Sequence, residues 1–506
     1  MAKWWTLVAV CIATFMLLLD ITVVNVALPY IERDLGSSFE DLQWVVDAYA
    51  LTLAAFLLTA GSVADRIGRR RVFLVGLAVF TVASALCGLA GTPLVLNLAR
   101  GLQGVGGAMM FATSLALLAS AYGGRDRGTA IGIWGATIGA AVAVGPLIGG
   151  VLVEWIGWEA IFYVNLPIGA YAIALTLRRV HESSDPQAGG ADWVGTVVFS
   201  AALFLLVFGL IRGNAEDWNG AIVACLVGAA ALLVAFVVVE RTTSHPMLDL
   251  TLFRKPSFGG ASIAAFVLSA SMFAMFLYLT LYVQNVLGYS ALESGLRFMP
   301  ITLISFVIAP VSGKLSERYG VRWFLTFGLA FVGVGLLLMR GLEPGDDWTA
   351  LLAGFMIAGA GIGMTNPALA TAAIGVVEPR RSGMASGINS TFRQVGVATG
   401  IAAWGAIFQH VVSSRFAEEA ARARLQRPRG VGGGAVSDFI AFGGAQRTGN
   451  GTLIRVAETA FDAGLNYILL IAAILALVGA ACCALLVRPA DFVAHAPAGA
   501  PAAAEA

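Results

Sequence analysis

Residues 61–71 read GSVADRIGRRR, and this stretch decides the fold. It is a charged turn between two apolar runs, each long enough to form a membrane-spanning helix. Residues 313–322 read GKLSERYGVR and form a weaker copy of the turn 252 residues later, again between two apolar runs. Two copies of one turn, each joining two long apolar segments, indicate a duplicated helical bundle.

The composition is that of a membrane protein. Of the 506 residues, 58% are hydrophobic and 12% are charged, and the mean hydropathy is +0.84. The net charge of +1 gives no reason to expect a nucleic-acid partner, because the basic residues gather in short turns. The five cysteines lie in apolar segments and the four histidines are scattered, so we expect no disulfide framework, no metal site and no cofactor.

Fourteen apolar segments are separated by turn and breaker residues. In lipid, each backbone polar group must be satisfied within its own segment, so we expect an all-α integral membrane protein with 14 transmembrane helices. The first segment is too long for a signal-peptide core and carries Asp20, so we expect it to be retained. The expected spans are approximately 4–29, 42–63, 72–91, 94–119, 129–152, 160–178, 192–211, 218–239, 258–283, 292–313, 322–340, 349–373, 384–409 and 464–487.

Lysine and arginine residues lie mainly on one side of the expected membrane. With a cytoplasmic N-terminus, 18 of them fall on that side and 3 fall in the short loops on the other. The positive-inside rule therefore predicts that both termini are cytoplasmic. Residues 410–463 hold seven arginines and five acids and become a long outer loop, which the rule tolerates because long loops cross regardless of charge.

The spacing of the two charged turns sorts the spans into groups. Spans 2 and 3 flank the first turn and spans 10 and 11 flank the second, so spans 1–6 and 9–14 are expected to be equivalent six-helix bundles. Spans 7 and 8 are an inserted pair. The expected division is 1–180 for the first bundle, 181–257 for cytoplasmic linkers with the inserted spans, 258–488 for the second bundle, and 489–506 for a disordered cytoplasmic tail.

Several motifs occur in the order and at the spans of one transporter family. Residues 61–71 match G-x3-D-R-x-G-R-x-[RK], residues 19–29 read LDITVVNVALP, and residues 145–150 read GPLIGG. On these motifs the chain resembles the major facilitator superfamily, specifically the fourteen-span drug:proton antiporters of the EmrB/QacA type. The resemblance covers roughly residues 5–490 and implies two six-helix bundles plus two inserted helices.

The charged turn carries the first set of candidate functional residues. Glycine permits a tight turn between close helices, and an aspartate can face a helix N-terminus or a basic side chain. The resemblance implies a conformational latch that stabilises the outward-open state. The alternative is a topology anchor of positive charge, which would need neither the aspartate nor the paired glycines. The latch residues are Gly61, Asp65, Arg66, Gly68, Arg69 and Arg71.

Asp20 in span 1 and Arg100 in span 4 are opposite charges at similar depth. Asp20 lies nine residues before Pro29, about 13 Å below the outer end of the span, and Arg100 lies about 10 Å deep. Charges inside a membrane are costly and usually face a cavity or a partner. We expect Asp20 to exchange a proton under the control of Arg100. The alternative is a static buried ion pair that fixes helix packing.

Span 5 is rich in residues that permit close helix packing or a kink. They resemble the antiporter motif of the family, although Ala141 stands where the family has a glycine. The resemblance implies a hinge that seals the cavity against proton leak. The motif residues are Gly139, Gly145, Pro146, Gly149 and Gly150.

Three further polar residues are candidates for substrate binding or coupling: Asn25 in span 1, Asp47 in span 2 and Arg393 in span 13. Arg393 lies about 15 Å deep, where a charge indicates either a functional site or a strut bonded to backbone carbonyls. Asn25 would serve equally well as a packing residue between helices. Asp47 could attract cationic substrates or be a solvated helix end.

These features predict a proton-coupled drug:proton antiporter that exports amphipathic, cationic or lipophilic compounds by alternating access. A dedicated exporter of one endogenous antibiotic or metabolite would carry the same motifs. The intact coupling motifs disfavour a non-transporting sensor, and the lack of a nucleotide-binding loop or nucleophile cluster argues against an enzyme. We expect a monomer in a bacterial plasma membrane, with small molecules, protons and lipid as partners.

Overall fold

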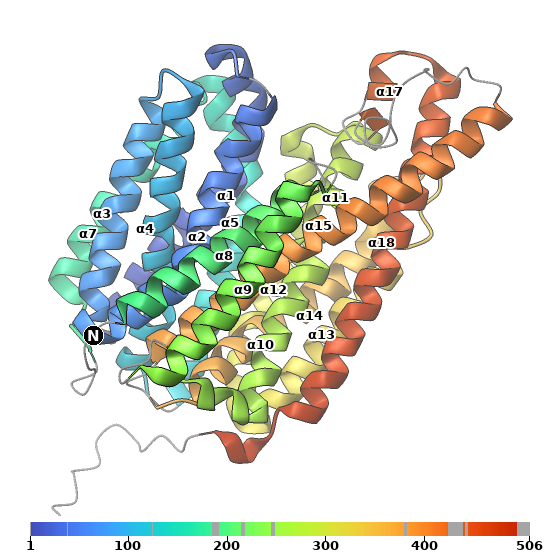
Figure 1. The fold of residues 1–506 in the computed structure, drawn as a ribbon. Coiled ribbons are helices and arrows are strands. Elements are labelled where there is room, and N and C mark those ends of the chain that lie inside the picture. Colours follow the sequence, from blue (N-terminus) through green and yellow to red (C-terminus); the bar gives the residue numbers. More distant parts are fainter. Residues whose placement is uncertain are drawn as a thin grey trace, which may run out of the picture.

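The computed structural model describes residues 2–37, 39–123, 125–184, 192–213, 218–243, 248–378, 382–423, 439–440 and 444–492. Helices make up nearly all of this part of the chain, and it contains no β-strand. Figure 1 shows two groups of helices side by side, with the beginning of α1 and the end of α18 at the same end of the molecule. The residues 493–506 of the predicted tail lie outside the described part.

The first group contains the helices of predicted spans 1–6. Within it α1 packs against α5 and α7, and both α2 and α3 pack against α4. Predicted span 6 is divided into a short helix and a longer one. The bounds are α1 Ala2–Leu35, α2 Phe39–Ile67, α3 Arg69–Gly88, α4 Pro93–Ala121, α5 Arg125–Trp155, α6 Ala160–Tyr163 and α7 Asn165–Arg179.

The second group contains the helices of predicted spans 9–14. Here α13 packs against α14 and α18, and α15 packs against α10 and α18. Predicted span 9 contains two π-helical segments, η2 and η3, which sequence patterns did not reveal. The bounds are α10 Pro256–Leu268, η2 Ser269–Phe273, α11 Met275–Leu281, η3 Tyr282–Val286, α12 Ala291–Tyr319, α13 Val321–Leu338, η4 Trp348–Leu351, α14 Leu352–Gly375, α15 Ser382–Arg422, α17 Gly444–Arg447, α18 Gly451–Leu486 and η6 Pro489–Asp491.

The predicted inserted pair is formed by α8 (Trp193–Gly213) and α9 (Gly220–Thr242), which pack against each other. A short helix, η1 (Leu250–Arg254), follows them. Helix α8 also contacts α2 of the first group and α15 of the second. In Figure 1 the pair, drawn in green, crosses the junction between the two groups.

The two groups meet directly through α5 with α12 and through α2 with α15. Glycines allow the first of these contacts. A Cβ atom added at Gly313 of α12 would lie 2.3 Å from the carbonyl oxygen of Gly128. One added at Gly132 of α5 would lie 2.8 Å from Cα of Pro310. The backbones of α5 and α12 therefore touch, which only residues without a side chain permit.

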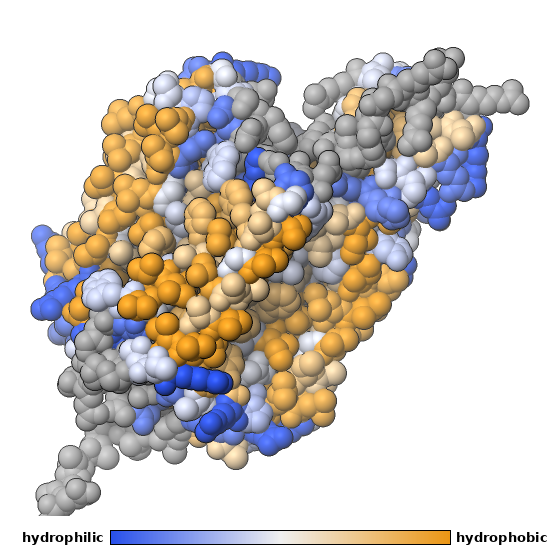
Figure 2. Space-filling model, in the orientation of Figure 1, coloured by the Kyte–Doolittle hydropathy of each residue, from blue (hydrophilic) through white to orange (hydrophobic). Residues whose placement is uncertain are grey.

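Thirteen helices among the described residues are long and apolar enough to cross a membrane. The remaining predicted span, 129–152, lies within α5, a continuous helix of 31 residues that is about 46 Å long at 1.5 Å per residue. Figure 2 shows hydrophobic surface over the middle of the molecule and polar surface toward its two ends. The chain is therefore a multi-pass membrane protein, and the count of fourteen spans stays a prediction.

Several helices are longer than the apolar runs that predicted them, including α18, which begins at Gly451 rather than near residue 464. Helix α1 continues past Pro29 to Leu35, and α15 continues past residue 409 to Arg422. The predicted outer loop 410–463 is therefore shorter in the structure, because both ends of it are helical. In the polar extension of α15, Arg422 pairs with Glu418 and Glu419 at 2.6 Å, and such pairs stabilise a helix without any apolar signal.

Candidate functional site

Asp20 and Arg100 form a buried ion pair, as the sequence suggested from their similar depth. Nη1 of Arg100 lies 2.5 Å from Oδ2 of Asp20, and the two side chains are 1% and 0% exposed. The other carboxylate oxygen, Oδ1, accepts hydrogen bonds from Gln103 Nε2 at 2.9 Å and from Asn165 Nδ2 at 3.0 Å. Both oxygens of Asp20 are thus engaged in the interior of the first group.

Further groups hold Arg100 in place. Its Nη1 donates to Gln103 Oε1 at 2.7 Å, and its Nε donates to the backbone oxygen of Val45 in α2 at 2.9 Å. The guanidinium carbon lies 4.3 Å from the centre of the Tyr49 ring, a cation–π contact. Arg100 therefore joins α4 to both α1 and α2.

Asn165 of α7 extends these contacts to α3. Its Nδ2 also donates to Ser84 Oγ of α3 at 3.0 Å, and that hydroxyl donates to the backbone oxygen of Phe162 at 2.8 Å. The Asp20 network thus contains Asp20, Ser84, Arg100, Gln103 and Asn165 and connects α1, α3, α4 and α7.

The Asp20 network has the features needed to bury a charge in a membrane protein. Removing two ions from water is repaid only when the geometry is good and the remaining donors and acceptors are satisfied. Here the carboxylate accepts from three donors. A protonated carboxyl has less capacity to accept and no charge to offset Arg100, so proton binding to Asp20 would weaken several helix contacts together.

Gln103, Asn165 and Ser84 were not recognised as site residues from the sequence. Gln103 follows Arg100 by three residues and so shares its helix face, which was a usable signal. Asn165 is a polar residue in a predicted span, but nothing local indicates that its partner is Asp20, 145 residues earlier. Neutral polar side chains in a span commonly pack between helices, so their presence alone does not identify a site.

Asp65, at the end of α2, joins the two groups of helices. Its Oδ1 accepts from Arg69 Nε at 2.8 Å, and its Oδ2 accepts from the backbone N–H of Met384 at 2.8 Å. Met384 lies in the first turn of α15, where backbone N–H groups lack helical partners and the helix dipole favours an anion. Asp65 therefore faces both a basic side chain and a helix N-terminus, the two partners considered from the sequence.

The rest of the charged turn is held by a residue that the sequence did not indicate. Glu182, which follows α7, accepts from the backbone N–H groups of Arg70 at 3.0 Å and Arg71 at 3.2 Å. It thereby caps α3, whose own N-cap position is Gly68 with φ of 118°. Its carboxylate lies 2.7 Å from where a Cβ of Gly68 would be, so the turn requires glycine both for φ and for space.

The remaining turn residues occupy different environments. Gly61 is buried in α2, Arg66 is half-buried, and Arg71 is largely exposed. In the weaker copy, Gly320 between α12 and α13 also has a positive φ of 93°, so both turns have a glycine in the same conformation. The side chain of Glu317 lies outside the described residues.

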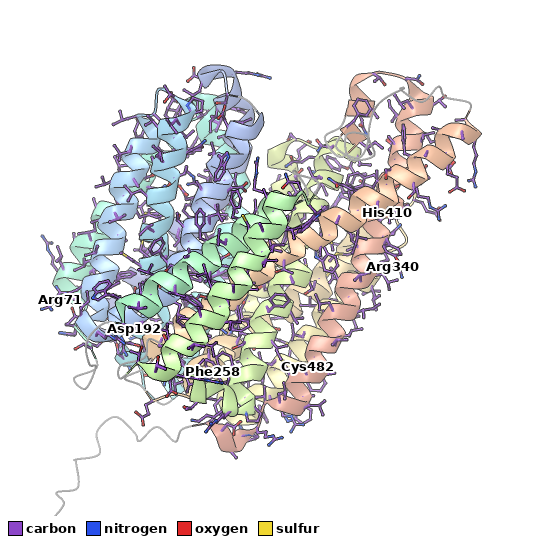
Figure 3. All side chains as sticks on the ribbon, in the orientation of Figure 1. Arg71, Asp192, Phe258, Arg340, His410 and Cys482 are labelled. Carbon is purple, nitrogen blue, oxygen red and sulfur yellow. The ribbon has the colours of Figure 1, made fainter. Side chains whose placement is uncertain are left out.

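The contact between Asp65 and α15 lies at one end of the molecule. Figure 3 places Arg71, six residues after Asp65, and Asp192 at the end where α1 begins. Asp65 thus joins the two groups at the end of the molecule where α1 begins.

For the drug:proton antiporter that the sequence predicts, Asp65→Asn is expected to slow efflux about 10-fold. An amide carries no charge, and hydrogen bonds to a charged group contribute about 1.5–3 kcal/mol, so the joined state would lose roughly one to two powers of ten in population. The measurement is the initial efflux rate at matched membrane levels. Asp126→Asn, which removes an exposed carboxylate at the start of α5, is the control, and equal behaviour of the two variants would reduce the turn to an anchor.

The glycines of span 5 face two different helices. Gly145 and Gly149 of α5 pack against Thr22 and Val23 of α1, two and three residues after Asp20. Gly139 faces α12 of the second group, where a Cβ would lie 3.7 Å from Ser305 Oγ. A Cβ at Gly150 would meet nothing within 4 Å, and the side chain of Pro146 lies outside the described residues. Helix α5 thus touches both the Asp20 region and the second group.

The three remaining candidates lie apart from the Asp20 network. Asp47 is half-buried on α2 and interacts electrostatically with Arg212 of α8. Arg393 is buried in α15 of the second group and donates to Asn366 Oδ1 of α14 at 3.1 Å. The side chain of Asn25 lies outside the described residues. Within the described part, no group of three or more potential metal ligands is gathered.

Comparison with known proteins agrees with the helix arrangement. The model of the Major Facilitator Superfamily matches residues 10–401. Multidrug resistance protein Stp of Mycobacterium tuberculosis is 38% identical over 404 residues, which cover 79% of this chain and 75% of that protein. The tetracenomycin C resistance and export protein of Streptomyces glaucescens is 34% identical over 502 residues, or 98% of this chain and 93% of that protein.

Solved structures with the same fold are transporters. The human organic anion transporter MFSD10 (TETRAN) aligns with a TM-score of 0.60 at 14% identity, covering 94% of this chain and 99% of that one. The proton:xylose symporter XylE aligns with a TM-score of 0.59 at 12% identity, covering 95% and 94%. At these identities the likeness concerns the fold alone. The chain is therefore a transporter rather than an enzyme, and it belongs to the Major Facilitator Superfamily, among relatives named for multidrug and antibiotic resistance.

Proposed function

We propose that this protein is a proton-coupled efflux transporter that exports amphipathic compounds, cationic or lipophilic, by alternating access. The Asp20 network carries the proposal. A carboxylate that is 0% exposed, is held by Arg100 and links four helices would couple proton binding to helix movement. In this proposal α1–α7 and α10–α18 are the two six-helix bundles, and the protein works as a monomer in the plasma membrane with both termini cytoplasmic.

The proposed cycle begins with the groups joined at the charged turn and apart at the outer end. A proton from outside neutralises Asp20 and releases Arg100, Gln103 and Asn165, so α1 and α4 lose their common attachment. Asp65 then separates from the N-terminus of α15, and the inner side opens to bind the compound. Proton release inside restores the ion pair. Each charge moved across 100 mV contributes about 2.3 kcal/mol to uphill export.

In this cycle the glycines of α5 maintain close contact with α1 while the groups move. Gly145 and Gly149 contact the helix of Asp20, and Gly139 faces the second group. The close packing of α5 against α1 next to Asp20 supports the proposal that the motif prevents proton leak. Asn25 and Asp47 stay candidates for coupling or for substrate contact.

A second candidate is a dedicated exporter of one antibiotic or metabolite made by the host cell. The observation that favours it is the match to a tetracenomycin C resistance and export protein over 98% of this chain. The two candidates share one coupling mechanism and differ only in substrate range.

The test is ethidium efflux from cells that make the wild-type protein, with and without a protonophore. Proton-coupled multidrug export predicts efflux that stops when the protonophore is added. Efflux that continues in a collapsed proton gradient would contradict proton coupling. If well-expressed protein moves no ethidium, the same assay with compounds made by the host cell would decide whether a dedicated substrate exists.

A further inference from the structure

Arg393 differs from Arg100 in having no acidic partner in the described part of the chain. It is 9% exposed and lies eleven residues after the start of α15, about 16 Å into the helix. Its Nη1 donates to Asn366 Oδ1 at 3.1 Å, a neutral amide. A guanidinium has five N–H donors and a full positive charge, so one amide oxygen leaves most of its bonding capacity and all of its charge unmatched.

Two side chains with an unsatisfied polar atom lie on the same face of α15 as Arg393. Ser386, Asn389 and Arg393 follow the i, i+3, i+7 spacing that places residues on one side of a helix. Asn389 is 3% exposed and Ser386 is 0% exposed. The Oγ of Ser386 and the Nδ2 of Asn389 have no hydrogen-bond partner within the described residues. We call Ser386, Asn389 and Arg393 the stripe. Leaving its buried polar groups unsatisfied costs about 1–3 kcal/mol each, so the stripe destabilises the protein unless a ligand binds there.

The stripe lies where the two groups of helices meet. Gly387, next to Ser386, packs against the backbone of Leu58 in α2. A Cβ atom added at Gly387 would lie 3.0 Å from Cα of Leu58. Asn366, the partner of Arg393, faces α5 of the first group, since a Cβ at Gly135 would lie 3.7 Å from Asn366 Cβ. A compound that passes between the groups must therefore pass this junction.

We propose that Ser386, Asn389 and Arg393 form a binding site for an anionic group of the exported compound, a carboxylate or an ionised phenol or enol. All three side chains can donate hydrogen bonds, and Arg393 matches a carboxylate with two parallel bonds. The inference rests on the proposed export function and places lipophilic acids among its substrates.

The alternative is that Arg393 is only a strut between α14 and α15. A strut would need Asn366 but would not need Asn389, and it would not distinguish a charged compound from a neutral one of the same shape. The two interpretations therefore differ in a binding measurement that requires neither turnover nor a proton gradient.

The experiment measures equilibrium binding to the full chain in lipid nanodiscs at neutral pH. The probes are lipophilic carboxylic acids, each paired with its neutral amide and led by pyrenebutyric acid and pyrenebutyramide, with empty nanodiscs as background. We expect at least one acid to bind wild-type protein about 10-fold or more tightly than its amide. Arg393→Gln should remove this preference and leave amide binding unchanged.

Two further variants keep the test decisive if Arg393→Gln fails to fold. Asn389→Ala leaves the bond between Arg393 and Asn366 intact, and it should weaken acid binding about 3- to 10-fold while sparing the amide. Arg340→Gln is the matched control, because it also replaces one arginine by glutamine. Arg340 donates to the backbone oxygen of Asn466 and is labelled in Figure 3. The Arg340→Gln variant should keep the preference.

The proposal is wrong if no acid is preferred over its amide, or if the preference survives both Arg393→Gln and Asn389→Ala. Because binding is measured without a gradient, its outcome is separate from that of the efflux test. Acid-selective binding with efflux that ignores the protonophore would overturn proton coupling alone. Protonophore-sensitive efflux without acid selectivity would overturn only the anion site.

Discussion

Asp20→Asn is expected to abolish gradient-driven efflux while the protein still reaches the membrane. Moving one proton down a gradient equivalent to 100 mV supplies about 2.3 kcal/mol, which can sustain roughly a 50-fold concentration ratio of the compound. Asparagine has nearly the same shape as aspartate but cannot bind and release a proton. The steady-state ratio across the membrane should therefore fall toward 1. The measurement is accumulation of ethidium in inside-out vesicles that are energised with a proton gradient.

The single variant also leaves Arg100 as an uncompensated buried charge. Removing one partner of a buried ion pair costs about 3–5 kcal/mol, because the remaining charge stays in a medium of low dielectric. Loss of efflux in Asp20→Asn could then reflect misfolding. The double variant Asp20→Asn with Arg100→Gln removes both charges, and we expect it to unfold at a higher temperature than the single variant but to remain inactive in coupled transport.

A surface carboxylate provides the control for this pair of variants. Asp126, at the start of α5, pairs with Lys3 and is 61% exposed, and exposed pairs contribute little to stability. Asp126→Asn should therefore transport like the wild-type protein. If the neutral double variant still builds a concentration gradient, the buried pair is a static element of packing and the proton binds elsewhere.

The pairing of Asp20 with Arg100 was predictable because charge inside a membrane is rare and costly. Each residue stands alone as a charge in its span, and helical rise places both at similar depth. The estimate of depth for Asp20 was less accurate, since α1 continues to Leu35 and Asp20 lies about 22 Å from that end. The prediction of the pairing did not depend on this estimate, because a buried charge requires a partner wherever the helix ends.

The supporting residues were not predictable by the same argument. Asn165 and Ser84 are neutral, so nothing in their spans requires a particular partner, and their contacts depend on how α3, α7 and α1 pack. Glu182 was missed for a related reason. It lies in a linker 112 residues after Arg70, and only the folded chain brings its carboxylate to the start of α3.

Apolar runs predicted where helices cross the membrane but not where they end. The polar extension of α15 to Arg422 is stabilised by side-chain pairs and carries no hydropathy signal. The π-helical segment Ser269–Phe273 likewise leaves the apolar pattern of its span intact. For Arg393 the sequence left two interpretations open, and the unpaired Asn389 one turn away became visible only from the packing of α15.

Gly145→Ala is expected to destabilise the protein and to abolish coupled efflux, whereas Gly150→Ala should be tolerated. A Cβ at Gly145 would lie 1.8 Å from Oγ1 and 2.6 Å from Cβ of Thr22, so rotating the hydroxyl, which bonds to the backbone oxygen of Leu19, cannot relieve the clash. Helix α5 must instead move away from α1 near Asp20, and overpacking of this kind costs about 1–3 kcal/mol.

Comparing Gly145→Ala with Gly150→Ala distinguishes a need for close contact with α1 from a need for bending of α5. A Cβ there meets nothing within 4 Å, and replacing glycine by alanine within a helix is favourable by about 0.5–1 kcal/mol. Gly149→Ala should lie between the two, because its Cβ would be 3.2 Å from Val23 Cγ1. Thermal unfolding and efflux of the three variants test this order. If Gly150→Ala is as damaging as Gly145→Ala, α5 needs glycine for bending rather than for contact with α1. If Thr22→Gly partly restores Gly145→Ala, the close approach of α5 to the helix of Asp20 is itself what coupled transport requires.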